Sequence, residues 1–527
     1  MKRPRWLLLG ILLGAFLLRM VQLDARAMWY DEAFAVLYAE TSFAQMWYGT
    51  VTQVQGAASD VHPLFFYTML HGWMNAVGAS ALAARFFSVL FGVATVAVVY
   101  RLTRELCRDD GEATLRISRR IDIMRDDVSR QTTADRRKFS SSERLPLLAA
   151  FIVAVAPFAV AYSQEARMYA QLGFFAALFL LAYVMLEKPR RRAWWIVLVL
   201  SGAAMLYSHN LAVFFGAALG VWIVIQVLIQ RNWRGLISFA FAGAAILLGW
   251  LPWLTLVPSQ LSKIEQAYWI STPTLLTVLQ TVLTFTADFD NARFPLPLLP
   301  FALIAALLLF VLFCYEFLRG GWRDKRVCLL AHLAILPPAL IFVASLWRPV
   351  YITRALMPSF LMAAILVAWL GLRLPPLLGK SLGVALALLA AASLVFYYTY
   401  ADFPRPPFRE ALAYLQAQSL PGDVIVHDNK LSFFPMYYYA RGDRLTQSFI
   451  ADPPGAGSDT LARPTQEALG LYAVSPQNAT QAQTRVWFIM FREAHESGAG
   501  NLDWMRAQYR EIQESSFHDL ELYLFEK

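Results

Sequence analysis

Two adjacent carboxylates follow the first apolar segment of this chain, in the sequence Met28-Trp-Tyr-Asp-Glu-Ala-Phe. Asp31 or Glu32 could act as a general base that takes a proton from an acceptor hydroxyl group. Asp is also favoured at the start of a helix, where its side chain caps free backbone N–H groups. The aromatic neighbours and the adjoining apolar segment favour chemistry on a lipid-carried substrate, but for Asp31 the catalytic and capping interpretations both stay open.

Three further groups of polar residues could bind a substrate. The segment Asp60-Val-His-Pro-Leu-Phe-Phe-Tyr67 could orient an acceptor, although a helix cap with proline in the first turn is the structural alternative. Arg167 and Arg354 suit a phosphate because a guanidinium donates two parallel hydrogen bonds, whereas an interfacial arginine can also extend to lipid headgroups. The candidate binding residues are Asp60, His62, Tyr67, Glu165, Arg167, Tyr169, His209 and Arg354.

The same residues give only a weak signal for a metal. Two acids and one histidine, Asp31, Asp60 and His62, lack the further ligand spacing of a metal site. The sequence therefore requires no cofactor, and a divalent cation is left without support. The three cysteines imply no disulfide framework, and Asn478-Ala-Thr matches a glycosylation pattern that often occurs by chance.

The apolar content of the chain places these groups beside a membrane. The chain has 527 residues, of which 58% are apolar and 16% charged, and its positive mean hydropathy is typical of a polytopic membrane protein. At about 20 residues per crossing, the sequence predicts eleven transmembrane helices. They lie near 6–23, 81–100, 145–163, 170–187, 193–208, 211–229, 236–257, 297–318, 327–346, 354–372 and 381–400.

The basic residues predict the orientation of these spans. Lys and Arg are retained on the cytoplasmic side, which places the N-terminus inside and, after an odd number of spans, the C-terminal tail outside. Residues 1–401 carry a net charge of +14 and residues 402–527 a net charge of −5. The positive charge therefore belongs to the inner membrane surface, and nothing argues for nucleic acid. A cleaved signal peptide ending near Ala25-Arg-Ala27 is the alternative to a retained first span.

Three regions lie outside the predicted spans. The outer loop 24–79 is rich in aromatic residues and is expected to form amphipathic helices in the membrane interface. The inner loop 101–144 mixes 12 basic and 9 acidic residues and is expected to be a mobile, solvated connector. The third region is the tail 402–527, which begins at Phe403-Pro-Arg-Pro-Pro-Phe408 because closely spaced prolines stop a helix.

The tail alternates helical and extended patterns. Its predicted helices lie at 409–419 and 501–510, its predicted strands lie at 423–427, 485–491 and 520–525, and 437–439 is predicted to be helical or interfacial. This alternation predicts a small α/β domain outside the membrane. The tail has neither a glycine-rich phosphate loop nor a nucleophile elbow, so a structural or acceptor-recognition role is the default expectation.

Taken together, these motifs resemble those of bacterial membrane glycosyltransferases of family 39. These are similar to protein O-mannosyltransferases and lipid A aminoarabinose transferases, which share the multi-span GT-C fold. The resemblance covers roughly residues 1–400. It is carried by Trp29-Tyr-Asp-Glu32, by Asp60-Val-His-Pro63 with Tyr67, by Gln164-Glu-Ala-Arg-Met-Tyr169, by Tyr207-Ser-His-Asn210 and by Arg354.

The resemblance implies transfer of a hexose or pentose from a polyprenyl-phosphate donor to an acceptor outside the bacterial plasma membrane. By this likeness Asp31 is the general base, Glu32 positions acceptor or donor, and Arg167 and Arg354 bind the donor phosphate and stabilise its charge as the glycosidic bond breaks. A single displacement with one base would invert the anomeric centre. The leaving phosphate is already charged, so the reaction requires no strong general acid.

The sequence departs from the family pattern in two places. Pro63 is followed by Leu64 where members often have a second proline, and the inner loop 101–144 is long. Metal use varies among the relatives, so the resemblance assigns no ion.

Two other classes of function stay open. A flippase or polymerase for lipid-linked sugars would be expected to place charged residues inside several spans, whereas here they concentrate at outer hinges. A non-catalytic membrane scaffold would need no pair of carboxylates at the membrane surface.

Overall fold

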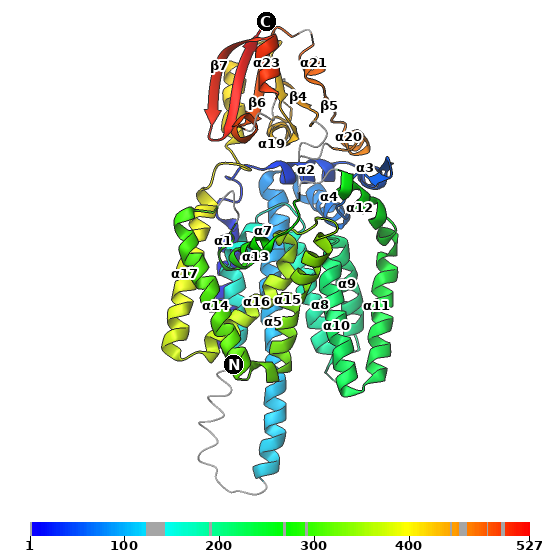
Figure 1. The fold of residues 1–527 in the computed structure, drawn as a ribbon, viewed down its shortest axis with the longest axis vertical. Coiled ribbons are helices and arrows are strands. Elements are labelled where there is room, and N and C mark those ends of the chain that lie inside the picture. The colour runs from blue at the N-terminus through cyan, green and yellow to red at the C-terminus, as the bar shows by residue number, and fades with distance from the viewer. Residues whose placement is uncertain are drawn as a thin grey trace.

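The computed structural model describes residues 3–122, 143–188, 192–266, 270–289, 294–442, 445–452, 461–481, 483–496 and 501–527. A bundle of long helices carries a small α/β domain at one end, and the first helix begins at the opposite end of the bundle (Figure 1). Short helices lie across the end of the bundle, between it and the α/β domain. The two ends of the bundle are therefore chemically different surfaces.

The bundle consists mainly of long apolar helices. They are α1 (Arg3–Met20), α5 (Ala81–Asp122), the pair Glu143–Val155 and α7 (Pro157–Ser163), α8 (Tyr169–Leu186), α9 (Trp194–Ser208), α10 (Ala212–Gln230), α11 (Trp233–Leu254), α14 (Leu299–Arg319), α15 (Lys325–Ser345), α16 (Met357–Arg373) and α17 (Pro376–Thr399). Among the described residues, eight helices are long and apolar enough to cross a membrane, or nine if the bent pair is one span. The chain is thus a multi-pass membrane protein.

The predicted count of eleven spans is not confirmed, although a helix lies at each predicted span. Three of the predicted spans are not among the eight helices that are long and apolar enough to cross a membrane, each for its own reason. Helix α1 carries Arg3, Arg5 and Arg19 within its 18 residues, α9 has only 15 residues, and the span predicted at 145–163 is bent by 58°. The inner loop is also corrected in part, because α5 continues as a helix to Asp122. Residues 123–142 lie outside the described residues.

The bend before α7 has a local cause. Pro157 has no backbone N–H, so it cannot continue the helix that ends at Val155. The buried Arg19 of α1 compensates by donating hydrogen bonds to the carbonyl oxygens of Val153 at 3.3 Å and Ala154 at 2.9 Å. Arg19 is thus one of the charged residues that make α1 less apolar, and it stabilises the break before α7. Helix α7 leads into the candidate site hinge at 164–168.

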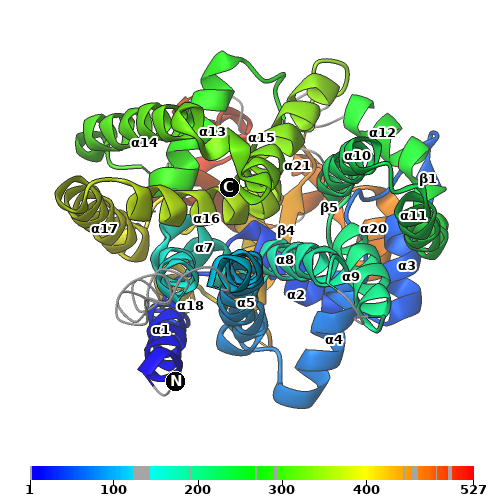
Figure 2. The same cartoon turned by 90° about the horizontal axis from the view of Figure 1, so that it is seen from below.

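The burial of the helices divides the bundle into centre and rim. Seen from below, α5, α7, α8 and α16 lie centrally, while α11, α14 and α17 lie at the periphery (Figure 2). The apolar windows of α8 and α16 are 78% and 72% buried, whereas those of α11 and α14 are 11% and 17% buried. The outward faces of these peripheral helices are apolar, as expected for helices that face lipid.

The predicted outer loop 24–79 is largely helical, as expected. It contains α2 (Tyr30–Glu40), α3 (Phe43–Val51) and α4 (Phe65–Val77), with a short antiparallel hairpin of β1 (Gln53–Val54) and β2 (Ala57–Ala58). Helix α2 lies across the end of the bundle (Figure 1). Asp31 and Glu32 fall in its first turn, where acidic side chains complement the helix dipole.

Five short elements complete the helical part of the membrane bundle. They are α12 (Val257–Gln266), α13 (Leu275–Ala287), and the 3-10 helices η1 (Leu296–Leu298), η2 (Gly321–Arg323) and η3 (Thr353–Leu356). The last of these carries Arg354 and leads directly into α16, which has proline in its first turn.

The tail forms an α/β domain with one six-stranded sheet. Its elements are α18 (Phe408–Gln418), β3 (Val424–His427), α19 (Lys430–Tyr439), β4 (Thr446–Ile450), α20 (Arg463–Leu469), β5 (Ala473–Val474), α21 (Pro476–Ala479), β6 (Arg485–Phe491), α22 (Arg492–Glu496), α23 (Leu502–Gln508), β7 (Arg510–Phe517) and β8 (Leu520–Glu526). The predicted strands at 423–427, 485–491 and 520–525 and the predicted helices are confirmed. Strands β4, β5 and β7 were not predicted.

The strand order of the sheet is β5-β4-β3-β6-β8-β7. Strand β3 pairs in parallel with β4 on one side and with β6 on the other, whereas β8 is antiparallel to its neighbours. The chain places β4 and β5 on one side of β3 and then places β6 on the other side. The switch point of the sheet, where the strand order changes direction, therefore lies between β3 and β6. In open α/β sheets, the crevice at the carboxyl ends of such strands is the usual place for a ligand.

This edge of the sheet faces the membrane bundle. Helix α19, which follows β3, packs on α2, and α20, which follows β4, packs on α3. Polar contacts support this packing: the Tyr439 hydroxyl accepts a hydrogen bond from the Met28 N–H at 2.8 Å, and the Thr465 hydroxyl donates to the Gly49 carbonyl at 2.7 Å. The α/β domain is thus seated directly on the helices that carry Asp31.

Candidate active site

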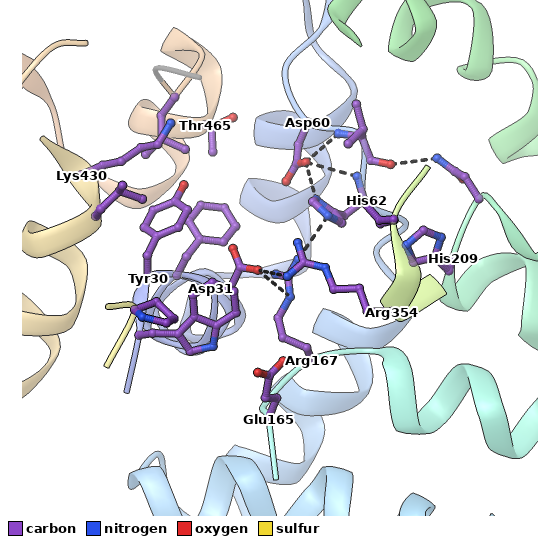
Figure 3. Close-up of a pocket in the computed structure, with 18 of the residues that line it drawn as sticks. Tyr30, Asp31, Asp60, His62, Glu165, Arg167, His209, Arg354, Lys430 and Thr465 are labelled. Atoms are coloured by element: carbon purple, nitrogen blue, oxygen red, sulfur yellow. Dashed lines mark hydrogen bonds and ion pairs between the residues drawn. The ribbon is translucent and has the colours of Figure 1, made fainter. Parts of the chain in front are cut away.

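A cavity of about 640 Å³ lies between the end of the bundle and the α/β domain. Its walls come from α2, from the hinges that precede α4, α8, α10 and α16, and from the α/β domain (Figure 3). Seven of the ten predicted site residues line it. These are Asp31, Asp60, His62, Glu165, Arg167, His209 and Arg354.

The hinges converge for a topological reason. Helices α7 and α9 end where α8 and α10 begin, so the hinges at 164–168 and 209–211 lie at the same end of the bundle. The segment that carries Arg354 joins α15 to α16 at that end as well. Residues that are distant in sequence thus come together because antiparallel neighbouring helices share their ends.

Asp31 lies between two arginines that come from different hinges. Its Oδ2 atom is 3.5 Å from Nη1 of Arg354 and 3.9 Å from Nε of Arg167. Among the described residues, this buried oxygen has no hydrogen-bond partner. The carboxylate is therefore held by charge rather than by saturated hydrogen bonds, and it keeps the capacity to accept a proton.

Arg167 is held from behind by a hydrogen-bonded chain. It donates from Nη1 to the Tyr67 hydroxyl at 3.0 Å and from Nη2 to Nε2 of His62 at 3.1 Å. A guanidinium has no acceptor, so His62 Nε2 accepts and the His62 Nδ1–H donates to Asp60 at 2.8 Å. Tyr67 thus supports the arginine from outside the cavity, and the chain fixes the direction of the guanidinium.

The environment of Asp60 keeps it ionised. Burial alone would raise the pKa of its carboxyl group. The adjacent His62 ring, the His62 backbone N–H and the positive charge of Lys263 all lower this pKa, and together they outweigh burial. The pKa of Asp60 is lowered to about 2. Asp60 therefore remains an acceptor that orients His62 at any physiological pH.

Arg354 lies between two aromatic rings. The centre of its guanidinium is 5.3 Å from the Tyr169 ring and 5.9 Å from the Trp29 ring, both within the range of cation–π attraction. Tyr169 was predicted to bind substrate, but it lies outside the cavity lining and supports Arg354. The aromatic residues of the Trp29-Tyr motif and of the 164–169 hinge thus position a cation.

His209 presents a neutral ring to the cavity. Its pKa is lowered to about 3, mainly by burial and in addition by the nearby His62, Arg354 and Arg167. Its Nδ1 accepts a hydrogen bond from the Leu211 N–H at 3.2 Å, so the ring proton is on Nε2. His209 is therefore a hydrogen-bond donor at neutral pH and does not add charge.

Glu32, the other half of the carboxylate pair, lies outside the cavity. It is fully buried and pairs with Arg85 through two hydrogen bonds of 2.8 Å, and it also binds Arg405. The Ala166 N–H donates a further bond to Glu32 at 3.0 Å. Burial alone would raise the pKa of Glu32, but the two guanidinium groups hold it far below its ordinary value. This geometry suits a structural anchor better than a reacting group.

The α/β domain supplies the remaining wall of the cavity. Lys430 from α19, Thr465 from α20 and Glu493 from α22 line it, and all three follow carboxyl ends of parallel strands. Lys430 lies 5.7 Å from the Tyr30 ring and 3.7 Å from the Asp452 carboxylate. Figure 3 shows Lys430 and Thr465 across the cavity from His62 and His209, with Asp31 between them.

Several site residues were missed at the level of sequence. Arg85 stands within an apolar span, where an arginine requires a partner, so its burial could have been anticipated. Arg405 was hidden in a proline-rich boundary, and Lys263 and Lys430 have no local signal. Among the described residues, no three His, Cys, Asp or Glu side chains cluster in a way that could hold a metal ion.

No family model and no curated protein sequence matches this chain. Solved structures do resemble it. The apo structure of ArnT from Cupriavidus metallidurans is 12% identical, with a TM-score of 0.62 over 99% of this chain and 98% of that chain. The structure of the same protein bound to undecaprenyl phosphate is 11% identical, with a TM-score of 0.58 over 98% and 97% of the two chains.

The archaeal oligosaccharyltransferase AglB from Archaeoglobus fulgidus is a more distant match. Its structure in complex with an inhibitory peptide and a dolichol-phosphate is 13% identical, with a TM-score of 0.52 over 99% of this chain and 74% of that chain. At these identities the likeness is one of fold. The predicted GT-C-like membrane fold with a small α/β domain is therefore confirmed.

Proposed function

We propose that this protein is a glycosyltransferase that moves a sugar from a polyprenyl-phosphate donor to an acceptor outside the cytoplasm. The observation that carries the proposal is the convergence of Asp31, Arg167 and Arg354 in one cavity at the end of a membrane bundle. A carboxylate with an unsatisfied oxygen beside two cations provides both a base and a binding site for a phosphate.

The donor phosphate binds to Arg167 and Arg354. Guanidinium groups recognise phosphate through charge-assisted hydrogen bonds, and the bound phosphate competes with Asp31 for the two cations. The solved structure of ArnT holds undecaprenyl phosphate and that of AglB holds a dolichol-phosphate, which supports a lipid phosphate as the ligand. The apolar outward faces of the bundle suit delivery of such a lipid from the membrane.

The transfer proceeds as one displacement. Asp31 takes the proton of the acceptor hydroxyl as its oxygen forms a bond to the anomeric carbon of the sugar. The bond between that carbon and the phosphate oxygen breaks, and the phosphate leaves with the electron pair. Arg167 and Arg354 stabilise the negative charge that develops on it. A single displacement inverts the anomeric centre, and no general acid is required because the leaving group is an anion.

The acceptor approaches from the side of the α/β domain. Lys430, Thr465 and Glu493 form the wall of the cavity that the bundle does not provide. They lie at the carboxyl edge of the sheet near its switch point, where α/β domains usually bind ligands. We assign the role of recognising a polar, hydroxyl-bearing acceptor to this wall, and that of membrane catalysis to residues 1–401, with 402–527 as the second domain.

This assignment includes an orientation. The site end of the bundle faces the outside of the bacterial plasma membrane, and the opposite end, where α1 begins, faces the cytoplasm. The excess of basic residues in the loops of that opposite end supports it.

The proposal is tested with the purified full-length protein in lipid nanodiscs. Undecaprenyl-phosphate sugars of the hexose and pentose classes, each radiolabelled, are incubated with the protein and with cell-envelope extract from a deletion strain. Transfer of label into the envelope fraction, inhibited by free undecaprenyl phosphate and absent with Asp31→Asn, is the expected result. Undiminished transfer with Asp31→Asn, or no transfer from any donor together with no binding of undecaprenyl phosphate, would contradict the proposal.

A further inference from the structure

The linker between the bundle and the α/β domain sends one side chain into the back of the site. Arg405 lies between α17 and α18, and it is 3% exposed. Pro404 precedes it and Pro406 and Pro407 follow it, so the backbone on both sides has a fixed φ angle. Its N–H also donates to the Asp402 carbonyl at 2.8 Å. The arginine is therefore presented by a rigid segment.

Arg405 binds the acidic neighbours of two residues in the proposed site. Its Nη1 donates to Glu32, which adjoins Asp31, and its Nη2 donates to Oε1 of Glu165 at 3.1 Å. Glu165 lies in the short hinge 164–168, two residues before Arg167. Nη1 also donates to the Ala27 carbonyl at 3.0 Å. One guanidinium thus joins the start of α2 to the hinge before α8.

The charges of this buried group balance only when Arg405 is present. Glu32 and Glu165 are two carboxylates, each at most 2% exposed, and Arg85 is bonded to Glu32. Without Arg405, Glu32 would keep its bonds to Arg85 but Glu165 would lose its ion pair with Arg405, and a buried charge without a partner is strongly unfavourable. Glu165 would then turn toward the cations of the cavity, of which Arg167 is its near neighbour in sequence.

We infer that Arg405 is a positioning residue that sets the spacing between Asp31 and Arg167, and that it makes this geometry depend on the linker to the α/β domain. Arg405 acts through Glu32 and Glu165 and does not line the cavity itself. This inference rests on the proposed function for its meaning in catalysis, but the positioning is a property of the protein that can be measured without turnover.

The chain offers a matched control. Arg441 also belongs to the α/β domain and also pairs with a glutamate of α2, but its partner Glu40 is the last residue of that helix. Its side chain is 32% exposed, whereas that of Arg405 is 2% exposed. A substitution of Arg441 removes a contact between the domains without touching the neighbours of Asp31.

Hydrogen–deuterium exchange of the full-length protein in nanodiscs, without ligand, gives the direct test. With Arg405→Gln, exchange in peptides covering 28–34 and 164–168 should become at least tenfold faster, with an intermediate effect for Arg405→Lys and a change below twofold for Arg441→Gln. With Glu165→Gln, only the 164–168 peptide should respond, because the Arg405–Glu32 contact is retained. Equal exchange in Arg405→Gln and Arg441→Gln, in both peptides, would overturn the inference.

Kinetics then separate positioning from general destabilisation. Arg405→Gln should lower kcat at least tenfold and raise the donor KM by less than threefold, because Arg354 reaches the phosphate from η3 and not from the linker. The kcat of Arg405→Lys should be at least threefold higher than that of Arg405→Gln. If Arg405→Gln does not fold, Arg405→Lys and Glu165→Gln decide by exchange. A wild-type protein that transfers no sugar would count against the proposed function, while the exchange result would still decide the role of Arg405.

Discussion

Asp31 and Glu32 are neighbours in the first turn of α2, and each faces two arginines from other parts of the chain. Glu32 is completely buried and makes hydrogen bonds of 2.8 Å to Arg85. Asp31 is 16% exposed, lies 3.5 Å and 3.9 Å from its arginines, and keeps one oxygen without a hydrogen bond among the described residues. The same kinds of group therefore form a saturated cluster on one side of the helix and an unsaturated one on the other.

The difference separates stability from chemistry. A buried carboxylate whose lone pairs are all used cannot take a proton without losing its partners, so the Glu32 cluster fixes the position of α2. A carboxylate held only by charge can exchange its partners for a substrate. Adjacent acidic residues in a sequence are therefore no guide to a shared role, and the following predictions test the contrast.

Asp31→Asn is expected to have the largest effect on activity. Loss of a general base lowers the rate by about 10²–10⁴-fold, with the melting temperature of the purified protein almost unchanged because Asp31 makes few saturated contacts. Radiolabel transfer and thermal unfolding of the same preparation measure the two quantities. Asp31→Asn protein that is fully active would remove Asp31 as the base.

Glu32→Gln is expected to show the reverse pattern, with stability affected first. Breaking a buried ion pair by removing one partner costs about 3–5 kcal/mol, which should appear as a lower yield of folded protein and a lower melting temperature. Because the pKa of Glu32 is lowered in the folded state, its contribution to stability is complete above its unfolded pKa of about 4.5 and is lost as the pH falls below it. A melting temperature equal to that of wild type would contradict the anchoring role.

Arg354→Gln is expected to weaken donor binding with the fold intact. A hydrogen bond to a charged group contributes about 1.5–3 kcal/mol, so affinity for undecaprenyl phosphate should fall by about 10- to 150-fold. Arg354→Lys should recover only part of this loss, because lysine keeps the charge and lacks the planar pair of donors. Equal affinities for wild type and Arg354→Gln would place the phosphate elsewhere.

His209→Gln is expected to have the smallest effect. The pKa of His209 is lowered to about 3, so the ring is neutral and its loss removes one neutral hydrogen-bond donor, worth about 1 kcal/mol. Transfer should fall by less than about tenfold, and the dependence of the rate on pH between 5 and 8 should be the same in both proteins. A shift of that dependence in His209→Gln would show that the histidine titrates in the working range.

Much of the α/β domain could be predicted from the sequence, and two of the missed strands, β7 and β5, were missed for separate physical reasons. Strands β3, β6 and β8 are runs of apolar residues in the interior of the sheet. Strand β7 lies at the edge with mostly exposed or half-exposed side chains, so its polar sequence has no hydrophobic period. Strand β5 has only two residues. A strand can be predicted where burial selects a pattern of apolar residues. A strand that faces solvent is under no such selection, and its sequence carries no such pattern.

The sequence by itself determined the membrane nature of the chain and the gathering of its polar hinges at one end. Hydropathy defines the helices, and their alternating direction across a membrane fixes which hinges share an end. The candidate set of Asp31, His62, Arg167, His209 and Arg354 follows from this without knowledge of the packing. Such information is one-dimensional, since it depends only on the order of apolar and polar segments.

The tertiary structure alone decided which carboxylate faces the cavity and which arginines hold each of them. Side chains of consecutive helical residues diverge by about 100°, so Asp31 and Glu32 must point differently, but only the rotation of α2 on the bundle selects the one that meets the cavity. Arg85 and Arg405, which both bind Glu32, are separated from it by 53 and 373 positions in the sequence. Such distant partners are chosen by the packing of whole elements, which no local pattern records.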